Sequence, residues 1–195
     1  MHGLINRALQ CFLRDTYGEE LWNRVMERAD LGFTCFEAML HYDEEITGQV
    51  LDLAAQQLSK AREDLLEDLG NYLVSHENTE ALRRLLRFGG VDFLEFLHSL
   101  DDLPGRARLA VPDLVLPSLE LTEIGAQEFK LICGNDIPGF GHVMMGVLRA
   151  MADDYGALAF LELDGSAASH ADVAITLFDE RHQEARAFDL SRKAS

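Results

Sequence analysis

The pattern of hydrophobic and polar positions divides this chain into a helical first half and a mixed second half. Through the first half, apolar residues recur every three or four positions, which is the spacing of an amphipathic helix. This spacing predicts helices over 3–16, 19–28, 43–58, 60–74, 80–87 and 93–103. Proline disfavours helical geometry in the residue before it, so Pro104 predicts that the last of these helices ends at Leu103. An extended connector should follow as far as Ser118.

After Pro117 the apolar residues alternate with polar ones, as they do in half-buried strands. The alternation predicts strands over 119–122, 129–133, 158–163 and 173–178, with one helix over 142–155. We therefore assign the chain to the α+β class. We interpret residues 1–185 as a single domain, with a mainly helical lobe over 1–105 and an α+β lobe over 106–185. Residues 186–195 read as a tail.

The charge, the cysteines and the apolar runs of the chain indicate which partners and which compartment to expect. The 195 residues include 34 Asp and Glu against 17 Lys and Arg, for a net charge of −17. So acidic a chain argues against nucleic acid or an anionic membrane as a partner. The three cysteines are widely spaced, which indicates a reducing compartment rather than a disulfide framework. We find no signal-peptide pattern and no apolar run near the ~20 residues that span a bilayer, so we expect a cytoplasmic protein.

Several stretches together are typical of one known family. They are HGLINRALQCFLRDTYGEELWNRV, MLHYDEEI, FLHSLDDL with the later VP and LPSLEL, and PGFGHVMMGVLRAM. In these the chain resembles the heme nitric oxide/oxygen binding (H-NOX) family, which includes the heme domain of soluble guanylate cyclase. The resemblance runs to about Val173. It implies a helical N-terminal lobe and a C-terminal lobe with a largely antiparallel four-stranded sheet and a long helix.

The resemblance also implies a function. It suggests a stand-alone bacterial-type sensory module that regulates a separate signalling protein, such as a histidine kinase or a cyclic-dinucleotide enzyme. In the family, a Leu-Asp-x-Leu helix end is followed at once by the histidine that ligates heme iron. Here residues 100–103 carry that pattern, and Pro104 stands at the position of the ligand.

A second heme motif of the family is also substituted. The family holds the heme propionates with a Tyr-x-Ser-x-Arg clamp, and Cys133, Asn135 and Ile137 stand at those positions. Proline has no lone pair for iron, and isoleucine cannot make a charge-assisted contact, which contributes roughly 1.5–3 kcal/mol. We therefore expect no heme bound in the family's manner and no other cofactor, with heme b as the alternative.

Three histidines are candidates for a replacement iron ligand: His98, His41 and His142. On a continuous helix His98 would point roughly 120° away from position 104. A histidine without a grouped partner is more often packed or exposed than a metal ligand, so we expect no metal site. Family members that hold oxygen place a tyrosine where this chain has Val143, which has no donor. The resemblance therefore predicts no oxygen carrier.

The sequence lacks the motifs of common enzymes, including a Gly-rich phosphate loop and a nucleophile elbow, and we predict no catalytic activity. Our main hypothesis is an apolar pocket that is collapsed or holds a nonpolar organic ligand. The expected pocket walls are Ile5, Leu97, Leu100, Pro104, Pro117, Cys133, Val143 and Leu148. The alternatives are a heme-based nitric oxide sensor with a non-standard axial ligand, and a protein-interaction domain without a ligand.

Overall fold

The computed structural model describes residues 1–164 and 172–178. The helices are α1 (Gly3–Tyr17), α2 (Glu19–Ala29), α3 (Glu44–Leu58), α4 (Arg62–Ser75), α5 (Glu80–Arg87), α6 (Phe93–His98), α7 (Leu103–Ala110) and α8 (Phe140–Tyr155). Single 3-10 turns lie at Glu77–Thr79 and Leu100–Asp102. The strands are β1 (Leu119–Gly125), β2 (Glu128–Cys133), β3 (Ala159–Asp164) and β4 (Asp172–Leu177). Most predicted elements are confirmed to within a residue or two at each end.

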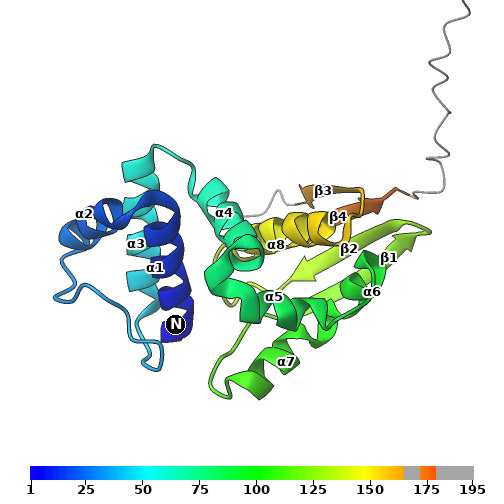
Figure 1. Ribbon diagram of the computed structural model, residues 1–195, viewed down its shortest axis with the longest axis horizontal. Coiled ribbons are helices and arrows are strands. Elements are labelled where there is room, and N and C mark those ends of the chain that lie inside the picture. Colours follow the sequence, from blue (N-terminus) through cyan, green and yellow to red (C-terminus); the bar gives the residue numbers. More distant parts are fainter. Residues whose placement is uncertain (165–171, 179–195) are drawn as a thin grey trace, which may run out of the picture.

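Helices α1, α2 and α3 form one side of the molecule, and the sheet with α5, α6 and α7 forms the other (Figure 1). Helix α1 begins where the His2 side chain accepts a hydrogen bond from the Leu4 N–H, 3.1 Å away. This bond satisfies one of the free donors at the helix start. The apolar stripe of α1, with Phe12 and Leu13 almost fully buried, packs with Trp22 of α2. The apolar residues that recur at helical spacing thus form the contacts that hold α1, α2 and α3 together.

Helix α4 runs between the two sides and packs closely along α8. Two glycines allow the close approach. A methyl group on Gly70 would lie 2.0 Å from the Val143 carbonyl oxygen, and one on Gly146 would lie 1.9 Å from that of Glu67. Only a residue without Cβ fits at either point, because the facing atoms belong to the backbone. This contact fixes the distance between α4 and the start of α8, where the cavity described below is found.

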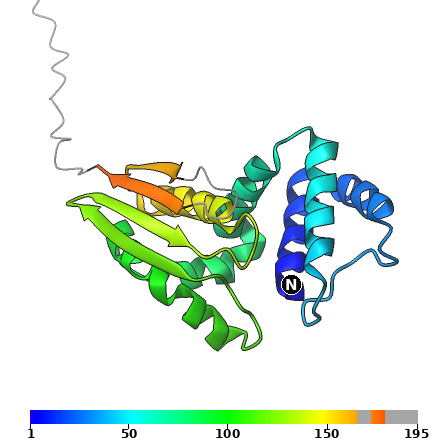
Figure 2. The same ribbon diagram turned by 180° about the vertical axis from the view of Figure 1, so that it is seen from behind.

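The strands form one antiparallel sheet in the order β1-β2-β4-β3, which confirms the α+β class. Phe129, Leu131 and Cys133 alternate with outward residues along β2, as the sequence pattern requires. Helices cover the face of the sheet that these residues share. No helix of the described chain covers the opposite face (Figure 2).

The hydrophobic side chains form two separate cores. One gathers residues of α1 to α4, including Trp22 and Leu65, and the other gathers Val74 with residues of α5, α6, α8 and the sheet, including Phe96 and Leu131. The change from one core to the other therefore falls at the end of α4, and α5–α7 pack with the sheet rather than with α1–α3. Residues 179–185 of the expected domain, and the expected tail over 186–195, lie outside the described residues.

The prediction of a helix ending at Leu103 was wrong. Helix α6 stops at His98, and after the 3-10 turn Pro104 stands in the first turn of α7, which continues to Ala110. Leu103 itself is helical, with φ −57° and ψ −44°. Proline suits a first helical turn because its φ is already near the helical value and its missing N–H has no partner there. The extended connector is correspondingly shorter.

Candidate ligand cavity

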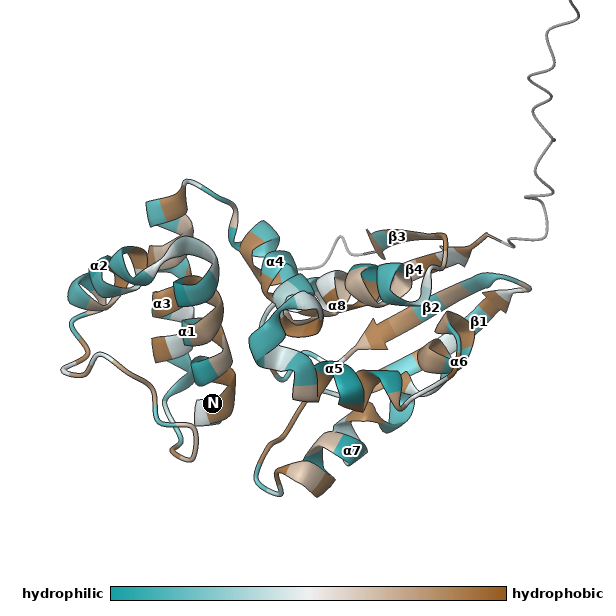
Figure 3. Ribbon diagram, in the orientation of Figure 1, coloured by the Kyte–Doolittle hydropathy of each residue, from teal (hydrophilic) through white to brown (hydrophobic). Residues whose placement is uncertain are grey.

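A cavity of about 210 Å³ lies between α1, α3, α4 and the first turns of α8. Leu116 of the connector into β1 and the turn before α8 complete its wall. That connector and much of β2 carry hydrophobic residues (Figure 3). The residues that line the cavity are Met1, Ile5, Ala8, Leu9, Glu44, Thr47, Gly48, Leu51, Arg62, Leu66, Leu69, Leu73, Leu116, Ile137, Pro138, Phe140 and Val143. The wall is thus almost entirely apolar.

Three of the lining residues carry polar side chains of consequence. Thr47 is buried, and its hydroxyl donates a hydrogen bond to Asn6 Oδ1 at 2.6 Å. Arg62 Nη1 forms an ion pair with Asp52 Oδ1 at 2.7 Å, so its charge is already matched. Glu44 is exposed in the first turn of α3, where the helix dipole favours a carboxylate. Met1, which also lines the cavity, carries the N-terminal ammonium, and this group donates a hydrogen bond to the Tyr42 carbonyl oxygen at 2.6 Å. Among its lining side chains, the interior therefore offers one hydroxyl and no unmatched cation.

The structure brings three of the sequence-selected residues to this cavity. Ile5 approaches from α1 and Val143 from α8. Ile137, at the position of the propionate-binding arginine in the resembled family, lines it from the turn before α8. These three residues come from widely separated parts of the chain, and the close α4–α8 packing helps to place Val143.

The other expected wall residues lie elsewhere. Leu97, Leu100, Cys133 and Leu148 are almost completely buried in the second core, beneath the sheet. Pro117 is buried near the start of β1. None of these five is among the residues that line the cavity.

The two remaining positions from the heme motifs are also outside the cavity wall. Pro104 is half-buried in the first turn of α7, and Asn135 is exposed in the turn after β2. Burial raises the pKa of the Cys133 thiol to about 12, with a smaller contribution from the charge of Asp172. Cys133 therefore keeps its proton at neutral pH and offers no thiolate ligand.

The candidate histidines do not converge. His98 is exposed, with Nε2 3.6 Å from Glu123 Oε1, and His41 is exposed with its ring centroid 5.0 Å from that of His2. His142 is half-buried near the start of α8. None of them lines the cavity. Within residues 1–164 and 172–178, no three His, Cys, Asp or Glu side chains are grouped closely enough to hold a metal ion.

The sequence did not identify much of the cavity wall, notably Thr47, Leu116 and Phe140, and three of the four leucines of α4. Leu66, Leu69 and Leu73 recur at helical spacing, so periodicity does identify them as one apolar face. Periodicity cannot tell whether such a face meets other side chains or an open volume. No signal in the sequence distinguishes these two outcomes.

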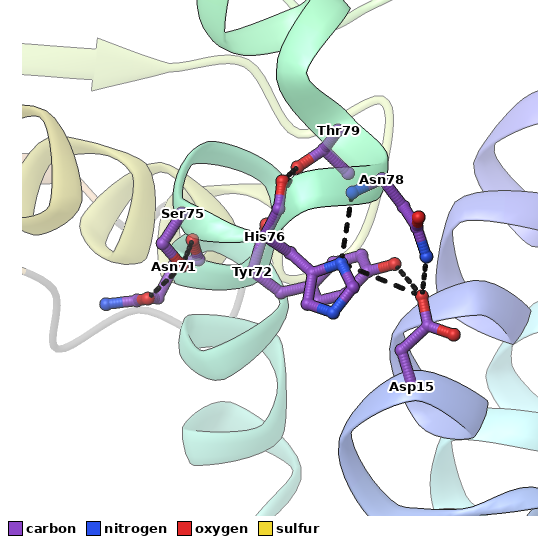
Figure 4. A network of polar contacts seen from close by, with 7 residues as sticks. All are labelled: Asp15, Asn71, Tyr72, Ser75, His76, Asn78 and Thr79. Carbon is purple, nitrogen blue, oxygen red and sulfur yellow. Dashed lines mark hydrogen bonds and ion pairs between the residues drawn. The ribbon is translucent and has the colours of Figure 1, made fainter.

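A polar network joins α1 to α4 near the surface (Figure 4). The Tyr72 hydroxyl donates to Asp15 Oδ2 at 2.5 Å, and Asn78 Nδ2 donates to the same oxygen at 2.8 Å. The hydrogen bond from Tyr72 is the main cause that lowers the pKa of Asp15, whereas burial raises the pKa of Tyr72. General acid–base catalysis favours a pKa near the working pH, and here the two values move apart. The network therefore connects helices rather than forming an acid–base pair.

The adjacent carboxylates Asp101 and Asp102 also have a structural explanation. Asp101 Oδ1 accepts a hydrogen bond from the Leu121 N–H at 2.8 Å, which satisfies a backbone donor on the outer edge of β1. Asp102 is exposed beside it. In the described part of the chain, no helix is both long and apolar enough to cross a membrane.

The model of the family described as Haem-NO-binding matches residues 2–159. Among curated proteins, soluble guanylate cyclase 89Db of Drosophila melanogaster is 19% identical over 158 residues, which cover 81% of this chain and 24% of that protein. Soluble guanylate cyclase gcy-31 of Caenorhabditis elegans is 21% identical over 154 residues. The chain spans about a quarter of the length of these relatives.

Solved structures show the same fold. The Fe(II) unliganded H-NOX protein from K. algicida has a TM-score of 0.78 at 17% identity, covering 92% of this chain and 97% of that one. The H-NOX protein from S. oneidensis in the Fe(II)NO ligation state has a TM-score of 0.76 at 18% identity, covering 92% of this chain and 100% of that one. The expectation of an H-NOX-like fold is thereby confirmed.

Proposed function

The chain belongs to the Haem-NO-binding family, and we propose that it is a sensory module that works without heme bound in the family's manner. In this proposal the cavity between α1, α3, α4 and α8 holds a nonpolar organic molecule in place of heme. Occupancy of the cavity would then be passed to a separate signalling protein. The observation that carries the proposal is a nearly all-apolar cavity that the candidate heme ligands do not reach.

The residues present do not fit heme as the family binds it, although the family typically does bind it. Pro104 cannot donate a lone pair to iron, and no histidine is among the residues that line the cavity. Ile137, at the clamp position, would leave the propionates unpaired in an apolar wall, which is unfavourable for charged groups. Heme is also larger than a typical drug, and pockets for drug-sized ligands measure roughly 300–1,000 Å³. The cavity of about 210 Å³ is below that range.

A nonpolar guest is supported by the character of the wall. Protein interiors pack at nearly crystalline density, so an apolar void is unfavourable unless something fills it. Filling the cavity removes the apolar surface of the guest from water, which contributes about 25 cal/mol per Å². Apolar cavities of comparable size stay dry and take up small apolar molecules. The guest would touch α1 and α8 together, two helices whose buried side chains belong to different cores.

The family and the charge support a proposal for the partner and the location. We propose that the module regulates a histidine kinase or a cyclic-dinucleotide enzyme in the cytoplasm, and that it has no catalytic site of its own. A net charge of −17 favours docking on a basic protein surface over binding to nucleic acid or an anionic membrane. The family is a sensor family, which agrees with a regulatory rather than an enzymatic role.

Absorbance and mass spectrometry test the proposal together. The protein is expressed with added heme precursor, and we expect the purified protein to be colourless. An organic extract is then analysed for a small nonpolar molecule in stoichiometric amount. A stoichiometric Soret band would contradict the proposal and favour the heme-based alternative, with His41, His98 and His142 as the ligands to replace. A colourless protein without any guest would favour the ligand-free interaction domain.

A further inference from the structure

The geometry of the cavity points to the class of its ligand, an inference that rests on the proposed function. We propose that the cavity takes a compact, uncharged and mostly apolar molecule, about the size of two fused aromatic rings, that carries one hydrogen-bond donor. The donor would reach the hydroxyl oxygen of Thr47. The volume of the cavity supports the size of the ligand, the charges of its lining support a neutral ligand, and the hydrogen bond of Thr47 supports the donor.

The volume sets the size. A dry cavity of about 150 Å³ lined by aliphatic and aromatic side chains binds benzene. The present cavity measures about 210 Å³ and has the same kind of lining, which includes Phe140 as well as several leucines. A molecule one fused ring larger than benzene therefore matches the space. A long alkyl chain or a macrocycle would not fit without movement of the wall.

The charges of the lining side chains favour a neutral ligand over an ionic one. Arg62 is already paired with Asp52, and the Met1 ammonium donates to the Tyr42 carbonyl oxygen at 2.6 Å, so no lining side chain supplies an unmatched cation to a carboxylate or phosphate. Glu44, at the start of α3, adds a negative charge that repels an anion. A cation would have to leave water for a mostly apolar interior, where burial of an unpaired charge is strongly unfavourable. A neutral molecule avoids both difficulties.

The hydrogen-bonding state of Thr47 selects a donor. Its hydroxyl proton is directed to Asn6 Oδ1 at 2.6 Å, and Asn6 is fully buried. A hydroxyl that already donates its proton keeps lone pairs with which it can accept. Because Thr47 lines the cavity, a ligand N–H or O–H can reach this acceptor, whereas the Thr47 hydroxyl has no second proton to donate to a ligand that has only acceptors. The rest of the buried wall is aliphatic or aromatic.

The first experiment compares indole with indene by calorimetric titration. The two molecules have nearly the same shape, but only indole carries an N–H. We expect indole to bind the wild-type protein about three- to tenfold more tightly than indene, as one net neutral hydrogen bond allows. In Thr47→Val the two affinities should become equal. Thr47→Ser keeps the hydroxyl, so this variant should retain the preference for indole and shows that the site still folds.

A second pair of variants tests whether these probes occupy this cavity. Ala8→Leu places a larger side chain into the cavity from α1 and should abolish binding of both molecules. Ala81→Leu makes the same change at an exposed position of α5 and should leave both affinities unchanged. Melting temperatures of all the variants, with and without probe, show which of them fold and bind.

The possible failures are distinguishable. Equal binding of indole and indene to the wild-type protein would overturn the donor inference and leave the proposed apolar cavity intact. Preference for indole that persists in Thr47→Val would overturn the role of Thr47. If neither probe bound, the proposed ligand class would be overturned. A higher melting temperature of Ala8→Leu would then show that the cavity exists and is simply not filled by such a ligand. If, in addition, the organic extract held no guest, the proposed function itself would fail.

Discussion

The Tyr72 hydroxyl donates a hydrogen bond of 2.5 Å to Asp15 Oδ2, which connects α4 to the last turns of α1 across residues far apart in the sequence. Asn78 supplies a second bond to the same oxygen (Figure 4). The pKa of Asp15 is lowered chiefly by the bond from Tyr72, which acts against the rise that burial causes. A carboxylate whose pKa is lowered on folding stabilises the folded state above its unfolded pKa. That stability is lost as the pH falls through the folded pKa.

Replacing Tyr72 by Phe should therefore lower stability in a pH-dependent way. We expect the free energy of unfolding to fall by about 1 kcal/mol near neutral pH, less than is usual for a bond to a charged group because Asp15 is partly exposed. The difference from wild type should shrink as the pH falls from the ordinary pKa of an aspartate toward the lowered pKa of Asp15 in the folded protein. Urea denaturation at several pH values measures both effects.

Tyr155→Phe is the matched control for this experiment. The Tyr155 hydroxyl donates to the Gly90 carbonyl oxygen at 2.8 Å, an acceptor that does not titrate. Loss of this bond in Tyr155→Phe should lower the free energy of unfolding by the same amount at every pH tested. An equal pH dependence in the two variants would show that Asp15 is not the group responsible.

The close approach of α4 and α8 predicts opposite outcomes for two helical glycines. Gly146→Ala should lower the free energy of unfolding by about 1–3 kcal/mol, because its methyl group would meet the Glu67 carbonyl oxygen at 1.9 Å. Gly105→Ala in α7 meets no atom within 4 Å and should raise stability by about 0.5–1 kcal/mol. Thermal and urea unfolding of both variants measure the contrast. A harmless Gly146→Ala would show that the two helices are farther apart than described.

The cysteines should differ in reactivity toward a thiol reagent such as DTNB. Cys35 is exposed, whereas Cys133 is 1% exposed and burial raises its pKa to about 12. We expect Cys35 to react within seconds to minutes in the folded protein and Cys133 to react only on unfolding. Cys35→Ser should remove the fast phase and leave the slow one. A fast phase that persists in the double variant Cys11→Ser/Cys35→Ser, in which only Cys133 remains, would contradict the burial of that thiol.

Restoring the family's iron ligand alone should not restore heme binding. Pro104→His places an imidazole at a half-buried position that does not line the cavity, and Ile137 still offers no partner for a propionate. We expect no stoichiometric Soret band when heme is titrated into this variant. Adding Cys133→Tyr, Asn135→Ser and Ile137→Arg tests whether the whole motif suffices. The matched control carries Cys133→Tyr, Asn135→Ser and Ile137→Arg but keeps Pro104. Stoichiometric heme in Pro104→His alone would mean that the heme site is already formed.

The sequence by itself was enough to predict the class of the fold and most of its elements. Helical spacing placed α1 to α5 and α8, and alternation placed the four strands, because burial of one face imposes these periods locally. The substituted motif positions were also visible directly, since they depend only on which residue stands at Pro104 or Ile137. The sequence misled us at Pro104 because one proline is compatible with either side of a helix boundary, and the neighbouring turn decides which.

Only the tertiary structure decided where the cavity lies and which residues line it. Ile5, Ile137 and Val143 line one cavity although they are far apart in the sequence, and Val143 is placed there by the close approach of α4 and α8 at Gly70 and Gly146. Leu97 and Leu148, equally apolar, fill the second core instead. An apolar residue is buried in either case, so its pattern in the sequence is the same. Whether it faces another side chain or an open volume depends on distances between elements far apart in the chain. Those distances are set by packing, which no local pattern records.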